Sequence, residues 1–232
     1  MLFRSVSILR LPDPVLLIER FDRVHEAERV RRLHIIDACQ ALNFPVSYKY
    51  ERNFGSGRDV RQIRDGASFP RLFSLVEYTV QKAVTRLTLL RWALFNYLVG
   101  NCDAHGKNLS FFCKHDGLSL APFYDLVSVV QYDGIDHELA MAYGDEFLLR
   151  EIAPFQWADF AHRTGITRSL LAREMRRMGK AALAAAPAQA SEATYVGDER
   201  AFVARISAFV QDQASKLLEM ATPMTRVDSS FL

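Results

Sequence analysis

The stretch FNYLVGNCDAHGKNLS, residues 95–110, is the most informative part of the chain because it joins two kinds of structure. Its first residues end a long apolar stripe with helical spacing, and its last residues begin a short apolar run typical of a strand. Between them lies the loop of residues 101–108, in which seven of eight residues are polar or small. Catalytic groups concentrate in loops that rigid elements hold in place. We therefore expect the chemistry of this protein in that loop.

The patterns on either side of the loop predict its supports. Apolar residues recur every three to four positions from Leu72 to Leu98, which predicts one core helix over about residues 71–99. After the loop, apolar runs at 109–113 and 118–122 flank an Asp-Gly turn, which favours a β-hairpin. The loop is therefore expected between a core helix and a hairpin.

Further elements follow from the same rules. Strands are expected at residues 7–11 and 15–21, and the second is a continuous apolar run typical of a strand buried on both faces. Residues 27–42 have helical spacing, and residues 51–68 form a polar, glycine-containing excursion. Three more helices are expected at 154–163, 167–186 and 198–221, with an Ala-rich linker containing Pro187 between the last two.

Composition limits the class of protein. The chain has 232 residues, and its 29 basic and 27 acidic residues give a net charge of +2. This near balance of charge excludes a histone-like basic protein, and a composition in which half of the residues are hydrophobic excludes a disordered or collagen-like one. Cys39, Cys102 and Cys113 form no C-x-x-C pair and are expected to be reduced thiols. The start is a poor signal peptide, and the most apolar window, residues 87–99, is too short to span a bilayer, so we expect a cytoplasmic protein with no membrane partner.

Asp103 and Asn108 have the Asp-x-x-x-x-Asn spacing of a protein-kinase catalytic loop. Tyr124 and Asp125 follow the predicted hairpin, where a kinase has its second metal-binding carboxylate. Phosphoryl transfer requires charge neutralisation and alignment, and Mg²⁺ prefers carboxylate and carbonyl oxygens. One base, one amide and one distant carboxylate match that chemistry. Each residue alone is a weak signal, because the spacing recurs by chance and a single Asp103 is more often a turn or helix-capping carboxylate.

Longer sequence motifs make the comparison with kinases more specific. FNYLVGNCDAHGKNLS closely resembles the catalytic loop of the HipA-like serine/threonine kinases, the toxins of bacterial toxin–antitoxin pairs. LAPFYDLVS, residues 120–128, resembles their metal-binding segment. LIERFDR, residues 17–23, resembles their hinge strand, and DACQAL, residues 37–42, the helix after it. KYE at 49–51 and LAMA at 139–142 match further family wording, so the resemblance covers about residues 15–144.

The resemblance implies a role for each matched residue. Asp103 is expected to be the catalytic base, and Asn108 and Asp125 the metal ligands. The backbone of the hinge is expected to hold the adenine of ATP. The cofactors implied are ATP and Mg²⁺. The residues expected to bind them are Glu19, Arg20, Phe21, His105, Gly106, Lys107, Asn108, Tyr124 and Asp125. As alternatives, Lys107 is a solvated surface lysine, His105 a structural histidine and Arg20 a partner in surface ion pairs.

The chain also departs from the family pattern. A kinase site needs a Gly-rich loop and a strand lysine over the phosphates, and in the family both precede the hinge strand. Here the residues before Val15 contain neither glycine nor lysine, and the first lysine is Lys49. Gly55-Ser56-Gly57 lies after the hinge and is no substitute. We therefore expect an N-lobe remnant and hinge strand at 1–24, a C-terminal kinase lobe at 25–222 and a tail at 223–232.

The expected fold class is α+β: a mainly helical, protein-kinase-like C-lobe with a β-hairpin and a remnant of the N-lobe sheet. The expected function is ATP- and Mg²⁺-dependent phosphorylation of a serine or threonine on a protein. The resemblance implies a translation component, such as an aminoacyl-tRNA synthetase, as substrate. It also implies a small DNA-binding antitoxin as partner, with DNA bound only indirectly through it. Two alternatives are an inactive remnant or pseudokinase binding module, and the C-lobe half of a split kinase.

Overall fold

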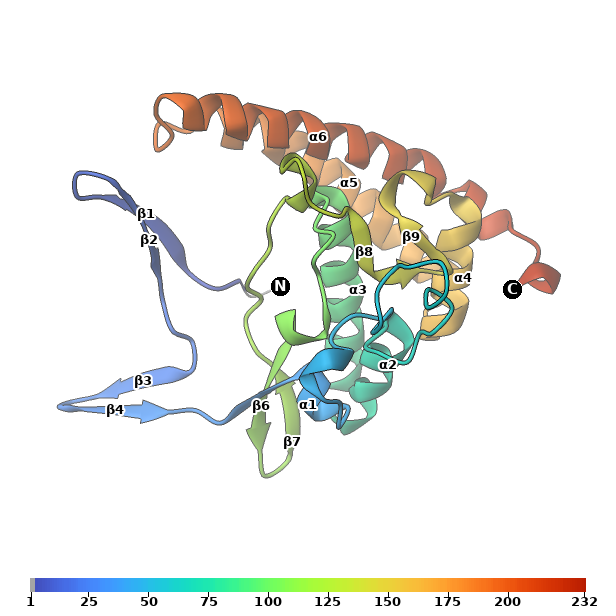
Figure 1. The fold of residues 1–232 in the computed structure, drawn as a ribbon, viewed down its shortest axis with the longest axis horizontal. Coiled ribbons are helices and arrows are strands. Elements are labelled where there is room, and N and C mark those ends of the chain that lie inside the picture. The colour runs from blue at the N-terminus through green and yellow to red at the C-terminus, as the bar shows by residue number, and fades with distance from the viewer. Residues whose placement is uncertain (1–2) are drawn as a thin grey trace.

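Three long helices form the body of the protein in the computed structural model, which describes residues 3–232. They are α3 (Lys82–Val99), α5 (Arg168–Ala190) and α6 (Asp198–Met220). In Figure 1, α5 and α6 lie antiparallel along one side of the molecule, and α3 crosses beneath them. The shorter helices α2 (Phe69–Ser74) and α4 (Pro154–Thr164) cover the other side of α3. The fold class is α+β, as predicted.

An aromatic cluster fills the core where α2, α3, α4 and a strand meet. Most of the rings contact one another edge-to-face, one pair is stacked and one is tilted, at centroid distances of 4.8 to 6.2 Å, a favourable arrangement for aromatic side chains. The cluster consists of Phe69, Trp92, Tyr97, Tyr143, Trp157 and Phe160, each at most 2 % exposed. This packing holds α3, and hence the loop that follows it, in a fixed position.

Gly100 ends α3 and directs the chain into the loop of residues 101–108. Its φ of +66° is left-handed, a conformation that only glycine adopts readily. A side chain at this position would also collide with Val130 and Phe209. The Asn101 backbone N–H then donates to the carbonyl of Asn96, which closes the helix end.

A three-stranded antiparallel sheet receives the loop at its other end. Its order is β5 (Ile35–Asp37), β6 (Ser110–Lys114) and β7 (Gly117–Leu120), with Asp37 paired to Ser110. The predicted hairpin after the loop is therefore confirmed. A second pair, β8 (Glu138–Tyr143) and β9 (Glu146–Leu148), packs against α2 and α4.

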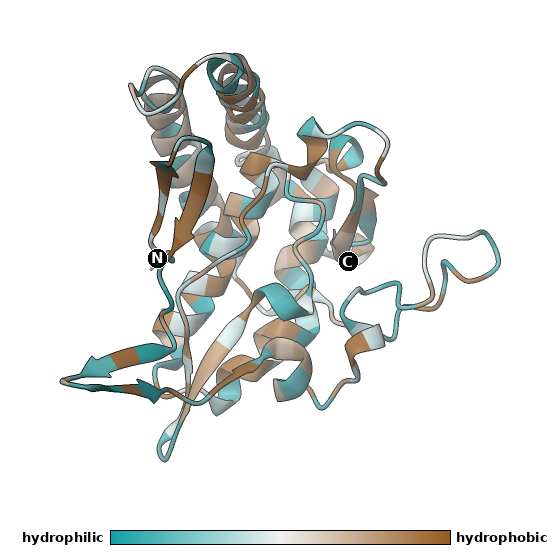
Figure 2. Ribbon diagram, turned by 60° about the vertical axis from the view of Figure 1, so that its left-hand side comes forward, coloured by the Kyte–Doolittle hydropathy of each residue, from teal (hydrophilic) through white to brown (hydrophobic). Residues whose placement is uncertain are grey.

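Two hairpins at the N-terminal end stand off the body along most of their length (Figure 1), although Arg10 at the tip of the first pairs with Glu199 at the start of the last long helix. The first is β1 (Val6–Arg10) with β2 (Pro14–Ile18), and the second is β3 (Arg23–Glu26) with β4 (Arg29–Arg32). Figure 2 shows that β1 and β2 are mainly hydrophobic, whereas β3 and β4 are mainly hydrophilic. Apolar side chains lie on both faces of the first hairpin, because Leu16 and Leu17 are consecutive strand residues and are 59 % and 52 % exposed.

The predictions for the N-terminal quarter are partly wrong. Residues 27–42 form no single helix: they contain β4, β5 and only the short helix α1 (Ala38–Ala41). The helical spacing was coincidental, since Val30 is 55 % exposed and packs on no core, and Ala27 adopts a turn conformation with φ of +51°. The second predicted strand ends at Ile18 and is exposed rather than buried on both faces.

The predicted helix over 71–99 is interrupted. It consists of α2, a 3₁₀ turn at Leu75–Tyr78 and α3, because residues 79–81 leave the helical path. Thr79 forms a bridge to Leu118, and the Val80 N–H donates to the Leu118 carbonyl, so this break lets the chain add to β7. Val80 and Val84 belong to the stripe but are 44 % and 58 % exposed.

Near the C-terminal end the expected helices are present. The expected linker at Pro187 is wrong, since α5 continues through Pro187 to Ala190. Helices α4 and α6 match their predicted ranges to within one residue. The three cysteines are free thiols, as expected. Among residues 3–232, no helix combines the length and the apolarity that crossing a bilayer requires.

Candidate active site

The loop of residues 101–108 is built into the body rather than laid over it. Its end forms a 3₁₀ turn, Gly106–Asn108, in which the His105 N–H donates to the Asn108 side chain over 3.1 Å. The Gly106 N–H donates to the Lys49 carbonyl over 2.9 Å. A side chain at Gly106 would lie 2.7 Å from Ala67 and 2.9 Å from the Cys39 sulfur. Glycine is therefore required here for close packing, and its N–H is already used within the chain.

Asn108 and Asp125 are brought into direct contact from opposite sides of the hairpin. The Asn108 amide nitrogen donates to the Asp125 carboxylate. Asp125 has a φ of +59°, an unusual left-handed conformation for a residue other than glycine. The Asn101 side chain donates to the Asp125 carbonyl over 3.1 Å and supports this conformation. The fold therefore joins the two predicted metal ligands.

The donor set fits a magnesium ion. Asp125 is exposed and, within residues 3–232, forms no ion pair, while the Asn108 carbonyl oxygen has a second lone pair besides the one that His105 uses. Mg²⁺ is commonly held by one or two protein oxygens, with water and phosphate as its other ligands. No cluster of three His, Cys, Asp or Glu side chains suited to a metal occurs in the described part of the chain. That result excludes a cage made of such side chains but leaves a two-ligand site.

Asp103 is the most exposed residue of the loop, in which only Lys107 besides it is not buried. One of its oxygens accepts a hydrogen bond from the Tyr50 hydroxyl over 2.8 Å. Burial, and then the contact with Asp103, raise the pKa of Tyr50, so this phenol remains a proton donor at neutral pH. Asp103 and Tyr50 line a cavity of about 510 Å³ together with residues from Arg52 to Ser56 and from Val129 to Ala140. A carboxylate at the edge of such a cavity can accept a proton from a bound hydroxyl.

His105 is a buried neighbour of this carboxylate. Its ring stands edge-on to Tyr50 at 5.2 Å, and its Nε2 lies 3.2 Å from the Lys49 ammonium. Burial lowers the pKa of His105, and the positive charge of Lys49 acts in the same direction. Lys49 and Tyr50 belong to the site, although sequence reasoning gave them no role. Because they lie more than fifty residues before Asp103, the only signal for them in the sequence was the match of the KYE motif at 49–51 to the family.

Lys107 forms an ion pair inside the chain. Its ammonium donates to Asp37 over 2.6 Å, and this hydrogen bond raises the pKa of Lys107. The other Asp37 oxygen caps helix α1 by accepting from the Gln40 N–H. Lys107 is thus not a freely solvated lysine, and its positive charge is already paired with Asp37. Its expected contact with phosphates stays a prediction.

Tyr124 connects the loop to the hinge. Its hydroxyl donates to the Lys107 carbonyl over 2.6 Å and lies 2.8 Å from the Ser110 hydroxyl. Its ring stacks on that of Phe21 at 6.0 Å. Among residues 3–232, the main-chain groups of Phe21 have no hydrogen-bond partner, whereas the N–H and carbonyl of Glu19 bond to Ser5 and Arg4. Of the hinge residues, Phe21 therefore fits an adenine contact best.

Arg20 is engaged in an ion pair, as one of the alternatives expected. Its guanidinium donates to both oxygens of Asp22, each over 2.7 Å, and Arg23 contacts the same carboxylate. The Arg20 carbonyl accepts from the Arg23 N–H. The hydrogen bonds from Arg20 lower the pKa of Asp22 to about 2. These contacts fix the turn that links β2 to β3.

A mainly helical lobe whose loop carries a carboxylate and an amide, with the amide in contact with a second carboxylate beyond a hairpin, is typical of a protein-kinase C-lobe. The family model described as the HipA-like C-terminal domain matches residues 3–188. The chain therefore belongs to the HipA-like C-terminal domain family.

Two curated proteins share much of the sequence. The serine/threonine-protein kinase toxin HipA of Shewanella oneidensis is 50% identical over 167 residues, which are 71% of this chain and 39% of that protein. The putative kinase Y4mE of Sinorhizobium fredii is 36% identical over 164 residues, 70% of this chain and 36% of that protein. The chain thus spans about two fifths of the length of these relatives.

Two solved structures share the fold. One is a HipA chain in the Shewanella oneidensis complex of HipA, HipB and operator DNA, with a TM-score of 0.93 and 41% identity over 98% of this chain and 55% of that one. The other is the proinflammatory kinase CtkA of Helicobacter pylori, with a TM-score of 0.51 and 11% identity over 97% of this chain and 77% of that one. The second likeness concerns the fold alone.

Proposed function

We propose that this chain is the C-terminal catalytic lobe of a HipA-type serine/threonine protein kinase, which transfers the γ-phosphoryl group of ATP to a protein hydroxyl. The observation that carries the proposal is the contact between Asn108 and Asp125, which come from the two sides of the β6–β7 hairpin. Asp103, on the same loop as Asn108, is exposed and lines the neighbouring cavity. Membership of the HipA-like C-terminal domain family supports it.

Each residue of the site then has a role that its chemistry allows. Asp103 accepts the proton of the attacking serine or threonine hydroxyl, while Tyr50 holds one carboxylate oxygen and leaves the other for the substrate. Asn108 and Asp125 hold Mg²⁺, which neutralises phosphate charge when it is bound. Asn101 keeps Asp125 in its left-handed conformation.

The remaining predicted residues form the surroundings of the nucleotide. His105 and Lys107 lie on the phosphate side, and Gly106 allows the loop to pack closely enough to place them. Tyr124 supports the loop by donating a hydrogen bond to the Lys107 carbonyl. The hinge residues Glu19, Arg20 and Phe21 hold the adenine, with the free main-chain groups of Phe21 as the principal contact.

The partners follow from the relatives. A complex of HipA with HipB and operator DNA is described for the Shewanella protein. By that likeness the present protein binds a small DNA-binding antitoxin and reaches DNA only through it. The substrate is a protein of the translation machinery, such as an aminoacyl-tRNA synthetase, and the compartment is the cytoplasm. We retain the division into an N-lobe remnant and hinge at 1–24, a kinase lobe at 25–222 and a tail at 223–232.

The exposed β1–β2 hairpin favours a second candidate, in which the chain works only with further N-lobe strands, as the C-lobe half of a split kinase. Seven large apolar side chains between Val6 and Ile18 are 38 to 75 % exposed. Such a surface normally packs against another sheet or chain. Without that partner, the chain is an inactive binding module.

A chimera tests the proposal and separates the candidates. This chain replaces the structurally matched part of the Shewanella HipA chain, and transfer of radiolabelled phosphate from ATP is measured with Mg²⁺. Transfer by the chimera but not by the chain alone supports a catalytic lobe that needs further strands. Transfer by neither, with both proteins folded, contradicts catalysis and supports the inactive module.

Nucleotide binding by the chain alone provides an independent check. Asn108 and Asp125 are the proposed metal ligands, but the residues before Val15 contain no glycine or lysine that could contact the phosphates. Each charge-assisted contact of that kind is worth roughly 1.5–3 kcal/mol. We therefore expect weak ATP binding that depends strongly on Mg²⁺ in calorimetry. Micromolar binding together with autophosphorylation would mean that another segment of the chain replaces those contacts.

A further inference from the structure

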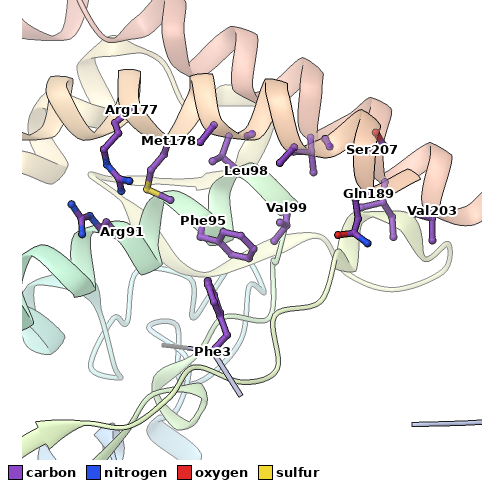
Figure 3. Close-up of a pocket in the computed structure, with 16 residues that line it drawn as sticks. Phe3, Arg91, Phe95, Leu98, Val99, Arg177, Met178, Gln189, Val203 and Ser207 are labelled. Atoms are coloured by element: carbon purple, nitrogen blue, oxygen red, sulfur yellow. The ribbon is translucent and has the colours of Figure 1, made fainter. Parts of the chain in front are cut away.

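A second cavity, of about 480 Å³, lies between α3, α5 and α6 and shares no lining residue with the cavity beside Asp103. Figure 3 shows it from the side, with Phe3 and Phe95 on one wall and α5 above them. The two rings are 5.6 Å apart, so Phe3 extends the wall that Phe95 begins. Its apolar lining includes Phe3, Phe95, Leu98, Met178, Val203 and Val210.

The cavity exists because α5 and α6 approach closely at one end and present small side chains at the other. A side chain at Gly179 would lie 2.9 Å from Leu218, so the two helices touch at that point. Beyond Gly179, α5 lines the cavity with alanines, which are too small to fill the space toward α3. These alanines are Ala181, Ala182, Ala185 and Ala186.

One end of the cavity is positively charged. Arg91 from α3 and Arg177 from α5 lie together at that end in Figure 3. Each uses its Nε to donate to the same oxygen of the buried Glu174, over 2.8 and 2.9 Å. Within residues 3–232, the terminal nitrogens of both guanidinium groups have no partner. Arg173 lies 3.7 Å from Glu174 as well, so three cations surround one carboxylate.

An apolar cavity of this size with a few polar groups at one end has the general character of a small-molecule site. The excess positive charge favours an anion at the arginine end, and a planar guanidinium binds a carboxylate well through two parallel hydrogen bonds. The apolar walls favour a hydrocarbon chain over the rest of the length. An apolar ligand without a head group would leave the guanidinium nitrogens unpaired.

We propose that this cavity binds a free amphiphile with an anionic head group, of the class of medium-chain fatty acids. The carboxylate head pairs with the terminal nitrogens of Arg91 and Arg177, and the chain lies along the alanine face of α5 toward Val203. Leu98 at the cavity wall is two residues before Gly100, so the ligand contacts the end of the helix that carries the loop of residues 101–108. The site is independent of phosphoryl transfer.

Calorimetry with dodecanoate and dodecanol, below the concentrations at which they aggregate, tests the site in the full chain. Ala185→Trp fills the cavity, and Ala184→Trp is its matched control, because both alanines are exposed on α5 but only Ala185 lines the cavity. We expect saturable dodecanoate binding that Ala185→Trp weakens at least about tenfold and Ala184→Trp leaves unchanged. Circular dichroism checks that both variants are folded.

A second pair of variants tests the head group. Arg177→Gln removes a lining guanidinium, whereas Arg173→Gln removes a neighbour that does not line the cavity. We expect Arg177→Gln to weaken dodecanoate about tenfold, the effect of one charge-assisted hydrogen bond, and to leave dodecanol binding unchanged. Arg173→Gln should change neither.

Three results would overturn the proposal. One is the absence of saturable dodecanoate binding to the unmodified chain. Another is an equal loss of affinity in the two tryptophan variants or in the two glutamine variants, which would place the ligand elsewhere. The third is a dimer in sedimentation that Ala185→Trp alone dissociates, since a second copy of the chain would then cover the cavity.

Discussion

In the loop of residues 101–108, six of eight residues are buried, whereas nine of the ten strand residues in β1 and β2 are exposed. The loop is tied to the body at several points, including the Gly106 N–H on Lys49 and the Ala140 N–H on Cys102. The tip of the β1–β2 hairpin reaches the body through Arg10, which pairs with Glu199 over 2.6 Å. The loop therefore gets its geometry from this chain's own core, while the hairpin has apolar surface that this chain does not cover.

The difference teaches which parts of a kinase-like site a C-lobe can build alone. The core around α3 and the β5–β6–β7 sheet hold Asp103 and Asn108 on one loop and bring Asp125 into contact with Asn108. Covering the phosphates needs strands, and the strands present here lack their own hydrophobic support. Substitutions in the buried loop and in the exposed N-terminal hairpins should therefore have separate effects, on catalysis and on association or stability.

The largest effect is expected at the two exposed carboxylates. Asp103→Asn in the chimera removes the proposed base and should lower phosphate transfer about 10²–10⁴-fold. Asp125→Asn removes the proposed metal-binding carboxylate while keeping the size of the side chain and a tolerance for the left-handed backbone, so transfer should be lost without misfolding. Rates are measured with radiolabelled ATP and folding with urea titrations. Retained transfer by a folded Asp125→Asn chimera with Mg²⁺ would reject the assignment.

This arrangement could be predicted from the sequence only in part. Asp103, His105 and Asn108 are neighbours in the chain, so one motif indicated all of them, and the hairpin signal brought Asp125 into reach. The Tyr50 contact could not be found in the same way. It depends on Glu51, whose buried carboxylate accepts from the Ala142 N–H over 2.8 Å and from Arg64, and thereby holds residues 49–51 beside the loop. Only the tertiary fold creates that contact.

The N-terminal elements were harder to predict for a different physical reason. Hydrophobic periodicity indicates a helix or strand only where a core receives the apolar face. Val30 and the apolar residues of β2 pack on no such core in this chain, so their spacing did not predict their burial. Around α3 the same rule succeeded, apart from the break at Thr79, which a strand contact with β7 explains.

The second prediction concerns the uncovered hairpin. The chain alone should self-associate, because apolar residues on both faces of β1–β2 and free strand edges favour pairing. Leu16→Lys together with Leu17→Lys places one charge on each face and should weaken association by at least about 100-fold, given roughly 1.5–3 kcal/mol for each buried leucine. Sedimentation velocity over a range of concentrations measures the effect. Val30→Lys, on the polar hairpin, is the control.

A monodisperse monomer of the unmodified chain at high concentration would contradict this contrast between loop and hairpin. Placing the chain in the chimera, where strands of the Shewanella protein can cover the hairpin, should suppress association as effectively as the lysine substitutions do. If the chimera associates as strongly as the chain alone, the hairpin surface is not the cause.

The third prediction concerns the turn between the hairpins. The arginine contacts lower the pKa of Asp22 to about 2, against an ordinary value of 3.8, so the charged form stabilises the folded state. This contribution, at most about 2 kcal/mol, is complete above about pH 4 and is lost as the pH falls through 2. Asp22→Asn should therefore lower the free energy of unfolding near pH 7 and converge with the unmodified chain near pH 2.

Urea titrations at several pH values measure that difference. Asp13→Asn is the matched control, since Asp13 is exposed and has no cationic partner in the part of the chain described by the structure. A difference between Asp22→Asn and the unmodified chain that is independent of pH would mean that packing, and not the charge, explains the effect.

The smallest effect is expected at Tyr50, because the substitution there removes a single hydroxyl, the one that donates to Asp103. Tyr50→Phe keeps the ring that contacts His105 and lies 4.7 Å from the Lys49 ammonium, and it removes only the donor to Asp103. Without this donor the carboxylate can rotate away from the substrate hydroxyl, so kcat of the chimera should fall about tenfold, or ~1.4 kcal/mol, with KM for ATP unchanged. Tyr132→Phe is the control, since Tyr132 lines the same cavity and its hydroxyl contacts neither carboxylate of the site. If Tyr50→Phe changed KM for ATP and left kcat within twofold, Tyr50 would serve nucleotide binding instead. The base would then be held by the loop alone, and the loop would need no help from residues 49–51.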